Sequence, residues 1–166
     1  MSWFKAYKDE IKEREEIGLS AKPIDDGELT KEIVLRIKDK NNTERNNALN
    51  FLIYNISPGT TASAKVKAFF LKEIITGEVI LEEISPSFAL ELLSHMKGGP
   101  SVDILLDLSL GENKLIARES AEILKSQIFL YKHDLDRLLE AFKNGNETAK
   151  EVLLSYSKAE FFTNLS

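Results

Sequence analysis

The double glycine at positions 98 and 99, followed directly by Pro100, separates two strongly apolar segments of this chain. The first segment opens with Ser85 and Pro86, residue types that favour the N-cap and the first position of a helix. Pro100 cannot continue a helix but can open the next one. We therefore predict two helices that fold back on each other here, with Gly98 and Gly99 in the left-handed conformation that ends a helix. The stripes at helical spacing are Phe88, Leu92, Leu93 and Met96, then Val102, Leu105, Leu106 and Ser109.

The second helix of this pair is apolar on more than one side, because Ile104 and Leu108 extend its stripe. A helix of this kind is buried between neighbouring helices. We therefore expect further helix pairs around this one, with Leu93 and Leu106 in the core.

The rest of the chain shows the same alternation of apolar helical stripes with breaks rich in Gly, Pro and Asn. The first predicted helix is Ser2–Ile17, and the helices before the central pair are marked by Leu29, Ile33, Val34 and Ile37 with an end near Asp39, by Leu49, Leu52, Ile53 and Ile56, and by Val66, Phe69, Phe70 and Ile74 with a stop at Gly77. After the central pair, one helix runs from about Asn113 to as far as Tyr131, one begins at Asp134 and is closed by Gly145, and one is marked by Ala149, Val152, Leu153 and Tyr156. A capping-box pattern at Ser157–Glu160 then precedes Phe161 and Phe162. Residues 78–84 are predicted to form a packed loop, because Val79–Leu81 has no evident partner strand.

Several of these helices have a predicted cap or core face. The predicted N-caps include Ser2, Thr43 and Asp134. The predicted core faces include Val66, Phe69, Phe70 and Ile74, and later Leu135, Leu138, Leu139 and Phe142. We predict an all-α fold of about nine helices, a HEAT-like α-solenoid of antiparallel helix pairs in one domain covering 1–166. A compact irregular helical bundle is the alternative.

Composition excludes several classes of protein. The 166 residues are 43% hydrophobic and 30% charged, which is typical of a globular domain. There is no cysteine, so the sequence offers no disulfide, thiolate zinc site or cysteine-held iron–sulfur cluster. The net charge of −5 argues against nucleic acid as a partner. No apolar run approaches the roughly 20 residues that span a bilayer, and the charged start MSWFKAYKDE is unlike a signal peptide. We expect a soluble cytoplasmic protein with no membrane partner.

Few residues suggest chemistry. His95 and His133 lack the second histidine of a zinc motif, so we interpret both as structural or surface residues. Asp103 and Asp107 share one helical face and could do acid–base work in a cleft, but they fit the solvated edge of their helix better. The helix start after the double glycine could hold an anion, although a helix stop and restart explains it more simply. We predict no catalytic, cofactor-binding or metal-ligating residue.

Several stretches together resemble a known family. They are Lys22–Asp25, Val66–Leu71 with Gly77-Glu78, Ala89–Leu93 running into Met96–Gly99, Lys143–Val152, and Ala159–Phe162. Their order and spacing are similar to the N-terminal HEAT-like domain of bacterial aconitase B over essentially the whole chain. One stretch departs from that pattern, since Pro100, Ser101 and Asp103 stand where the resemblance leads us to expect tyrosine, asparagine and histidine.

The resemblance implies a role within a larger enzyme of the tricarboxylic acid cycle. That family interconverts citrate and isocitrate through a [4Fe–4S] cluster, and many members also hydrate 2-methylaconitate. Its cluster cysteines and catalytic residues lie in later domains, so the resemblance implies no cofactor in this chain. It also implies that the domain packs against the catalytic core and takes part in protein–protein contact.

We therefore predict a non-catalytic interaction domain whose partner is the catalytic region of an aconitase B or a second copy of itself. The predicted interaction residues are Tyr156, Phe161 and Phe162, because an apolar aromatic end of a helical stack needs a cover. The alternative for the two phenylalanines is that they fold back onto the preceding helix pair. Two rival functions stay open at this point: a stand-alone adaptor that binds a peptide or protein, and a small enzyme that uses Asp103 and Asp107.

Overall fold

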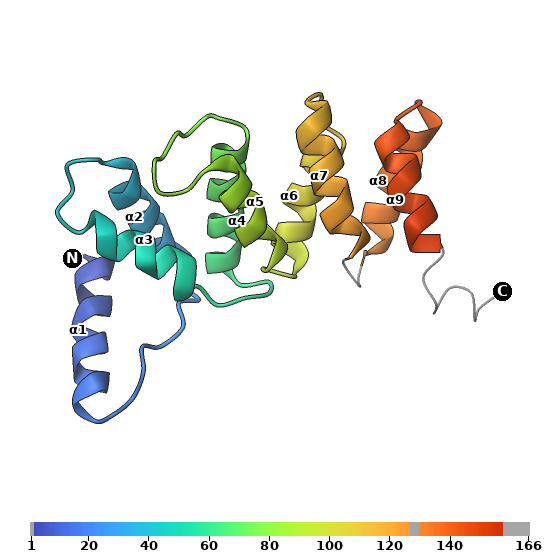
Figure 1. Ribbon diagram of the computed structural model, residues 1–166. Coiled ribbons are helices and arrows are strands. Elements are labelled where there is room, and N and C mark those ends of the chain that lie inside the picture. The colour runs from blue at the N-terminus through green and yellow to red at the C-terminus, as the bar shows by residue number, and fades with distance from the viewer. Residues whose placement is uncertain (1, 127–129, 158–166) are drawn as a thin grey trace. The chain divides into compact units, whose positions relative to one another are not determined.

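A computed structural model describes residues 2–126 and 130–157, and within these residues it contains nine α-helices and no strand (Figure 1). The helices are α1 (Trp3–Glu16), α2 (Gly27–Lys38), α3 (Arg45–Tyr54), α4 (Ala62–Ile75), α5 (Pro86–Ser94), α6 (Gly99–Ser109), α7 (Lys114–Lys125), α8 (Lys132–Lys143) and α9 (Glu147–Ser157). The all-α prediction is confirmed. The chain divides into two compact units, Met1–Pro100 and Ser101–Ser166. The single domain and the solenoid arrangement stay predictions.

Two of the predicted helix starts are confirmed in detail. Ser2 and Ser85 are the N-caps of α1 and α5, and each hydroxyl accepts a backbone N–H three residues on, at 3.1 Å. The prediction for Thr43 is wrong, because the N-cap of α3 is Glu44 and no side chain caps it. The predicted third helix is also too long: Ile56 lies beyond α3, where it forms an isolated bridge with Ile24.

The turn between α5 and α6 has a different geometry from the one predicted. The residue with positive φ is Lys97, at 43°, and neither Gly98 nor Gly99 is left-handed. Gly98 is required for another reason. A Cβ atom at Gly98 would lie 2.6 Å from the carbonyl oxygen of Gly59, so only glycine lets the two backbones approach this closely.

Within the first unit, α2 packs against α1, α3 and α4, and α4 also packs against α5. The prediction that Phe69 belongs to the core face of α4 is wrong, since its side chain is 60% exposed. The buried face of α4 instead carries Ala64, Lys67, Ala68, Phe70, Leu71, Ile74 and Ile75. Lys67 is thus a lysine at a core position, and it is only 7% exposed.

Within the second unit, α9 packs against both α7 and α8 (Figure 1). The core here includes Leu124, Leu138 and Val152 together with small alanines on α7. The predicted core face of α8 is only partly correct: Leu138 is fully buried, but Leu139 and Phe142 are exposed. Among the described residues, no helix is long and apolar enough to cross a bilayer.

Leu93 and Leu106, both predicted to be core residues, are fully buried. We expect Leu93→Ala to lower the free energy of unfolding by about 2–5 kcal/mol, because it removes apolar burial and leaves a cavity. Leu35→Ala is the matched control, since Leu35 is exposed on α2 and its truncation should cost less than about 0.5 kcal/mol. Urea denaturation followed by circular dichroism measures both, and equal losses would contradict the assignment of the core.

The buried amine of Lys67 makes stability depend on pH. Its Nζ donates a hydrogen bond of 3.4 Å to the carbonyl oxygen of Ile53, and burial lowers its pKa to about 8. An unfolded lysine keeps a pKa near ~10.4. Between these values the unfolded chain holds a proton that the folded chain has lost, so stability rises as the pH rises from 8 towards 10.

We therefore expect Lys67→Met to stabilise the fold below pH 8, by on the order of 1–3 kcal/mol. This gain should shrink as the pH approaches 10, where the native lysine is neutral when folded. Thermal unfolding of the variant and the native chain across this pH range tests the prediction. Lys65→Met is the control, because Lys65 is exposed on the same helix and its removal should give no such pH-dependent difference.

Candidate functional site

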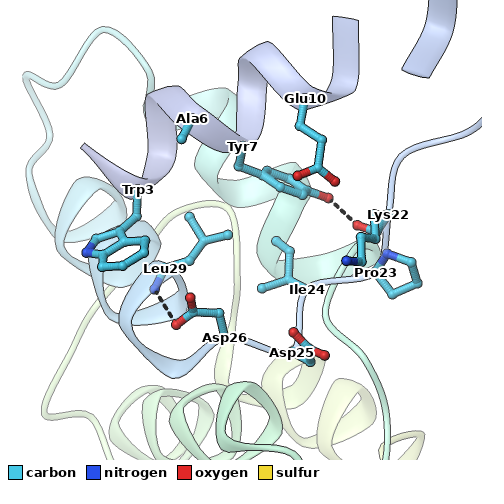
Figure 2. Close-up of a pocket in the computed structure, with 10 residues that line it drawn as sticks. All are labelled: Trp3, Ala6, Tyr7, Glu10, Lys22, Pro23, Ile24, Asp25, Asp26 and Leu29. Atoms are coloured by element: carbon cyan, nitrogen blue, oxygen red, sulfur yellow. Dashed lines mark hydrogen bonds between the residues drawn. The ribbon is translucent and has the colours of Figure 1, made fainter. Parts of the chain in front are cut away.

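Figure 2 shows a shallow hollow in the first unit, lined by one face of α1, the connector that follows it and the start of α2. Its volume is about 190 Å³. Ligand pockets for small molecules usually measure ~300–1,000 Å³, so this hollow is too small to enclose such a ligand. The lining residues are Trp3, Ala6, Tyr7, Glu10, Lys22, Pro23, Ile24, Asp25, Asp26 and Leu29.

The polar groups of Tyr7 and Asp26 in the hollow form hydrogen bonds within the protein. The hydroxyl of Tyr7 donates to the carbonyl oxygen of Lys22 at 2.7 Å (Figure 2). The same hydroxyl accepts from the side-chain amide of Asn55 at 3.0 Å. Burial raises the pKa of Tyr7, with the nearby Glu10 acting in the same direction against Asn55 and Arg14. Asp26 caps α2 by accepting the N–H of Glu28 at 2.8 Å. The lining residues contain no serine, cysteine or histidine.

The second unit brings charged residues of α6 and α8 together. Asp107 forms an ion pair with Arg137, in which Oδ1 of the aspartate lies 2.7 Å from Nη1 of the arginine. Asp103 is exposed, and Asp107 is half-buried, which agrees with the predicted solvated edge of α6. These two carboxylates do not form an acid–base pair in a cleft, because the guanidinium group of Arg137 holds the carboxylate of Asp107.

Asp103 lies near His133 and Asp134, the second and third residues of α8. One ligand atom each of Asp103, His133 and Asp134 falls within 4.8 Å of the others. The sequence suggested no such group, because position 103 and positions 133–134 are thirty residues apart. His95, the other histidine, is exposed at the C-cap of α5.

The prediction that Asp134 is the N-cap of its helix is wrong. The N-cap is Tyr131, and Asp134 is the third residue of α8, where its Oδ2 accepts the backbone N–H of Tyr131 at 3.0 Å. This position turns the carboxylate back over the start of the helix, and the residue is almost completely buried. One local pattern points to this arrangement, since an acidic residue three positions after an N-cap is common at helix starts.

The predicted interaction residues are only partly within the described chain. Tyr156 lies in the last turn of α9 and is half-buried. Phe161 and Phe162 lie outside the described residues. Their assignment to an interaction surface therefore stays a prediction.

Comparison with known proteins finds one family and several relatives. The family model described as the aconitate B N-terminal domain matches residues 6–162. Aconitate hydratase B of Helicobacter pylori is 35% identical over 158 residues, and that of Escherichia coli is 34% identical over 158 residues. Aconitate hydratase B of Pseudomonas aeruginosa is 32% identical over 159 residues. Each match covers 95% of this chain but only 18% of the relative.

Proposed function

The chain belongs to the aconitate B N-terminal domain family, and from this membership we propose that it is a non-catalytic interaction domain of an aconitase B. The observation that carries the proposal is the coverage: the similarity extends over 95% of this chain, which corresponds to 18% of each relative's length. The reaction of the whole enzyme, the interconversion of citrate and isocitrate in the tricarboxylic acid cycle, then takes place in the larger remaining part of such a protein.

The donor groups of this chain do not fit the iron–sulfur cluster that the family implies. Iron–sulfur clusters are held chiefly by cysteine thiolates, and the sequence has no cysteine. The group formed by Asp103, His133 and Asp134 offers nitrogen and oxygen donors instead. We therefore assign no step of the aconitase reaction to residues of this chain.

An interaction role is supported by the apolar side chains that the second unit exposes. They are Leu115, Tyr131, Leu139, Phe142 and Leu154. Where such side chains lie together in one patch, they mark a contact between proteins. The partner that we propose is the catalytic region of an aconitase B, with a second copy of this chain as the alternative, and the cytoplasm is the proposed location.

We expect the chain to bind a separately expressed catalytic region of an aconitase B. Phe162→Ala and Tyr156→Ala should each weaken this binding by roughly tenfold or more, as truncation of an aromatic anchor in an interface does. Sedimentation velocity with the two purified proteins measures the association. Circular dichroism on each variant should give an unchanged helical content.

Tyr54→Ala is the matched control, because Tyr54 is an exposed tyrosine on α3 of the first unit, and its loss should leave the association unchanged. Failure of the native chain to bind the catalytic region would contradict the proposed partner. Unchanged binding with a large loss of thermal stability in Phe162→Ala would place that ring in the core and the interface elsewhere.

A further inference from the structure

The carboxylate of Asp134 has an oxygen atom whose burial needs an explanation. The residue is 1% exposed, and its Oδ1 has no hydrogen-bond partner among the described residues. Buried polar atoms in folded proteins are nearly always hydrogen-bonded, because an unpaired one loses its hydrogen bonds to water and gains no bond within the protein. A buried carboxylate oxygen without a donor therefore indicates a missing positive partner.

The atoms around this oxygen are themselves donors for a cation. Nε2 of His133 lies 3.2 Å from Oδ1, yet the pair does not meet the geometry of a hydrogen bond. A carboxylate oxygen of Asp103 completes a group in which all three ligand atoms lie within 4.8 Å of one another. Ligand atoms of a metal ion gather around a common centre and need not bond to one another, so three ligand atoms this close together leave room for an ion between them.

The charges nearby leave the two carboxylates without a full counterion. Arg137 is already paired with Asp107 at 2.7 Å, and Lys132 with Asp136 at 2.7 Å. A cation placed between Asp103 and Asp134 would compensate two negative charges that these ion pairs do not.

We propose that Asp103, His133 and Asp134 bind one divalent transition-metal ion, which links α6 to the start of α8. One imidazole nitrogen and two carboxylate oxygens form a ligand set that suits zinc and similar first-row ions. Bonds of ~2.0–2.2 Å to a tetrahedral ion place neighbouring ligand atoms roughly 3.3 Å apart. The 3.2 Å between His133 and Asp134 already matches this separation. Asp103 is exposed, so its side chain can rotate to close the remaining distance.

Two contacts of Tyr131 would orient the ligands. Its backbone N–H holds Oδ2 of Asp134 at 3.0 Å, which leaves Oδ1 for the ion. Its ring stacks on the imidazole of His133, with centroids 5.8 Å apart and planes 7° from parallel. Contacts of this kind fix the direction of a ligand and commonly affect metal affinity.

A titration of the untagged full chain with Zn²⁺ tests the proposal. The sequence contains only two histidines, so imidazole signals in ¹H–¹⁵N spectra report on His133, with His95 as an internal control. We expect the His133 signals to shift and saturate at one ion per chain, while those of His95 stay in place. Calorimetry under the same conditions gives the affinity, and Mg²⁺ should not compete, because it prefers oxygen ligands and retains its water.

Substitutions separate this site from unspecific binding. His133→Gln and Asp103→Asn remove one ligand each at exposed positions, so neither threatens the fold, and each should weaken Zn²⁺ binding by more than about tenfold. His95→Gln and Asp136→Asn are the matched controls and should leave the affinity unchanged. Circular dichroism confirms that each variant is folded.

Three results would overturn the proposal. They are the absence of Zn²⁺ binding to the native chain at millimolar concentration, an equal response of the His95 signals, and an affinity that does not change in His133→Gln or Asp103→Asn. In the first case, His133 alone would be the partner of Asp134, across the 3.2 Å contact between them, and no metal would be needed.

Discussion

The close crossing of α2 and α4 is the contact on which the first unit depends. Gly27 has no side chain, and a Cβ atom there would lie 3.2 Å from that of Ala62, so small residues allow the two helices to approach. The close approach buries two hydroxyl groups, those of Thr30 and Ser63, which satisfy each other at 2.7 Å. Because α2 also packs against α1 and α3, and α4 against α5, a change that separates this crossing would disturb the packing of three other helices.

The attachment of α1 follows from this position of α2. Glu32 on α2 accepts the hydroxyl of Ser2 at 2.6 Å and the backbone N–H of Phe4 at 3.0 Å, so its carboxylate caps the start of α1 from a neighbouring helix. Burial opposes the charge of Glu32, but the bonds from Ser2, Phe4 and Arg36 outweigh it and lower its pKa. Arg36 also covers the ring of Phe4, at 4.5 Å from the ring centroid. A carboxylate at a helix N-terminus is favoured by the helix dipole as well, so one side chain serves both helices.

Sequence reasoning succeeded for two helix caps that local chemistry decides, and it failed for features that packing decides. The caps Ser2 and Ser85 depend on residues three positions away, and both were predicted correctly. In α4, however, Val66, Phe69, Phe70 and Leu71 surround the helix with apolar groups, so periodicity alone leaves the core face ambiguous. In the packed structure, the side chain of Phe69 is exposed and that of Lys67 is buried. The left-handed residue was missed for a similar reason, because Gly98 is needed for its contact with Gly59 across the fold.

The candidate site shows the same limit in a sharper form. Each of its residues was visible in the sequence and was interpreted alone: His133 as a surface residue, Asp103 as part of a solvated edge, and Asp134 as a cap. What makes them a site is the burial of one oxygen atom, and no local pattern predicts that. The other polar link between α6 and α8, from Asp107 to Arg137, has side chains 35% and 47% exposed, and exposed pairs contribute only about 0–1 kcal/mol. A metal ion held between the same two helices would therefore be the stronger of the two links. It would lie on α8, which packs against the helix that carries Tyr156, and so would connect the proposed metal site with the proposed interaction surface.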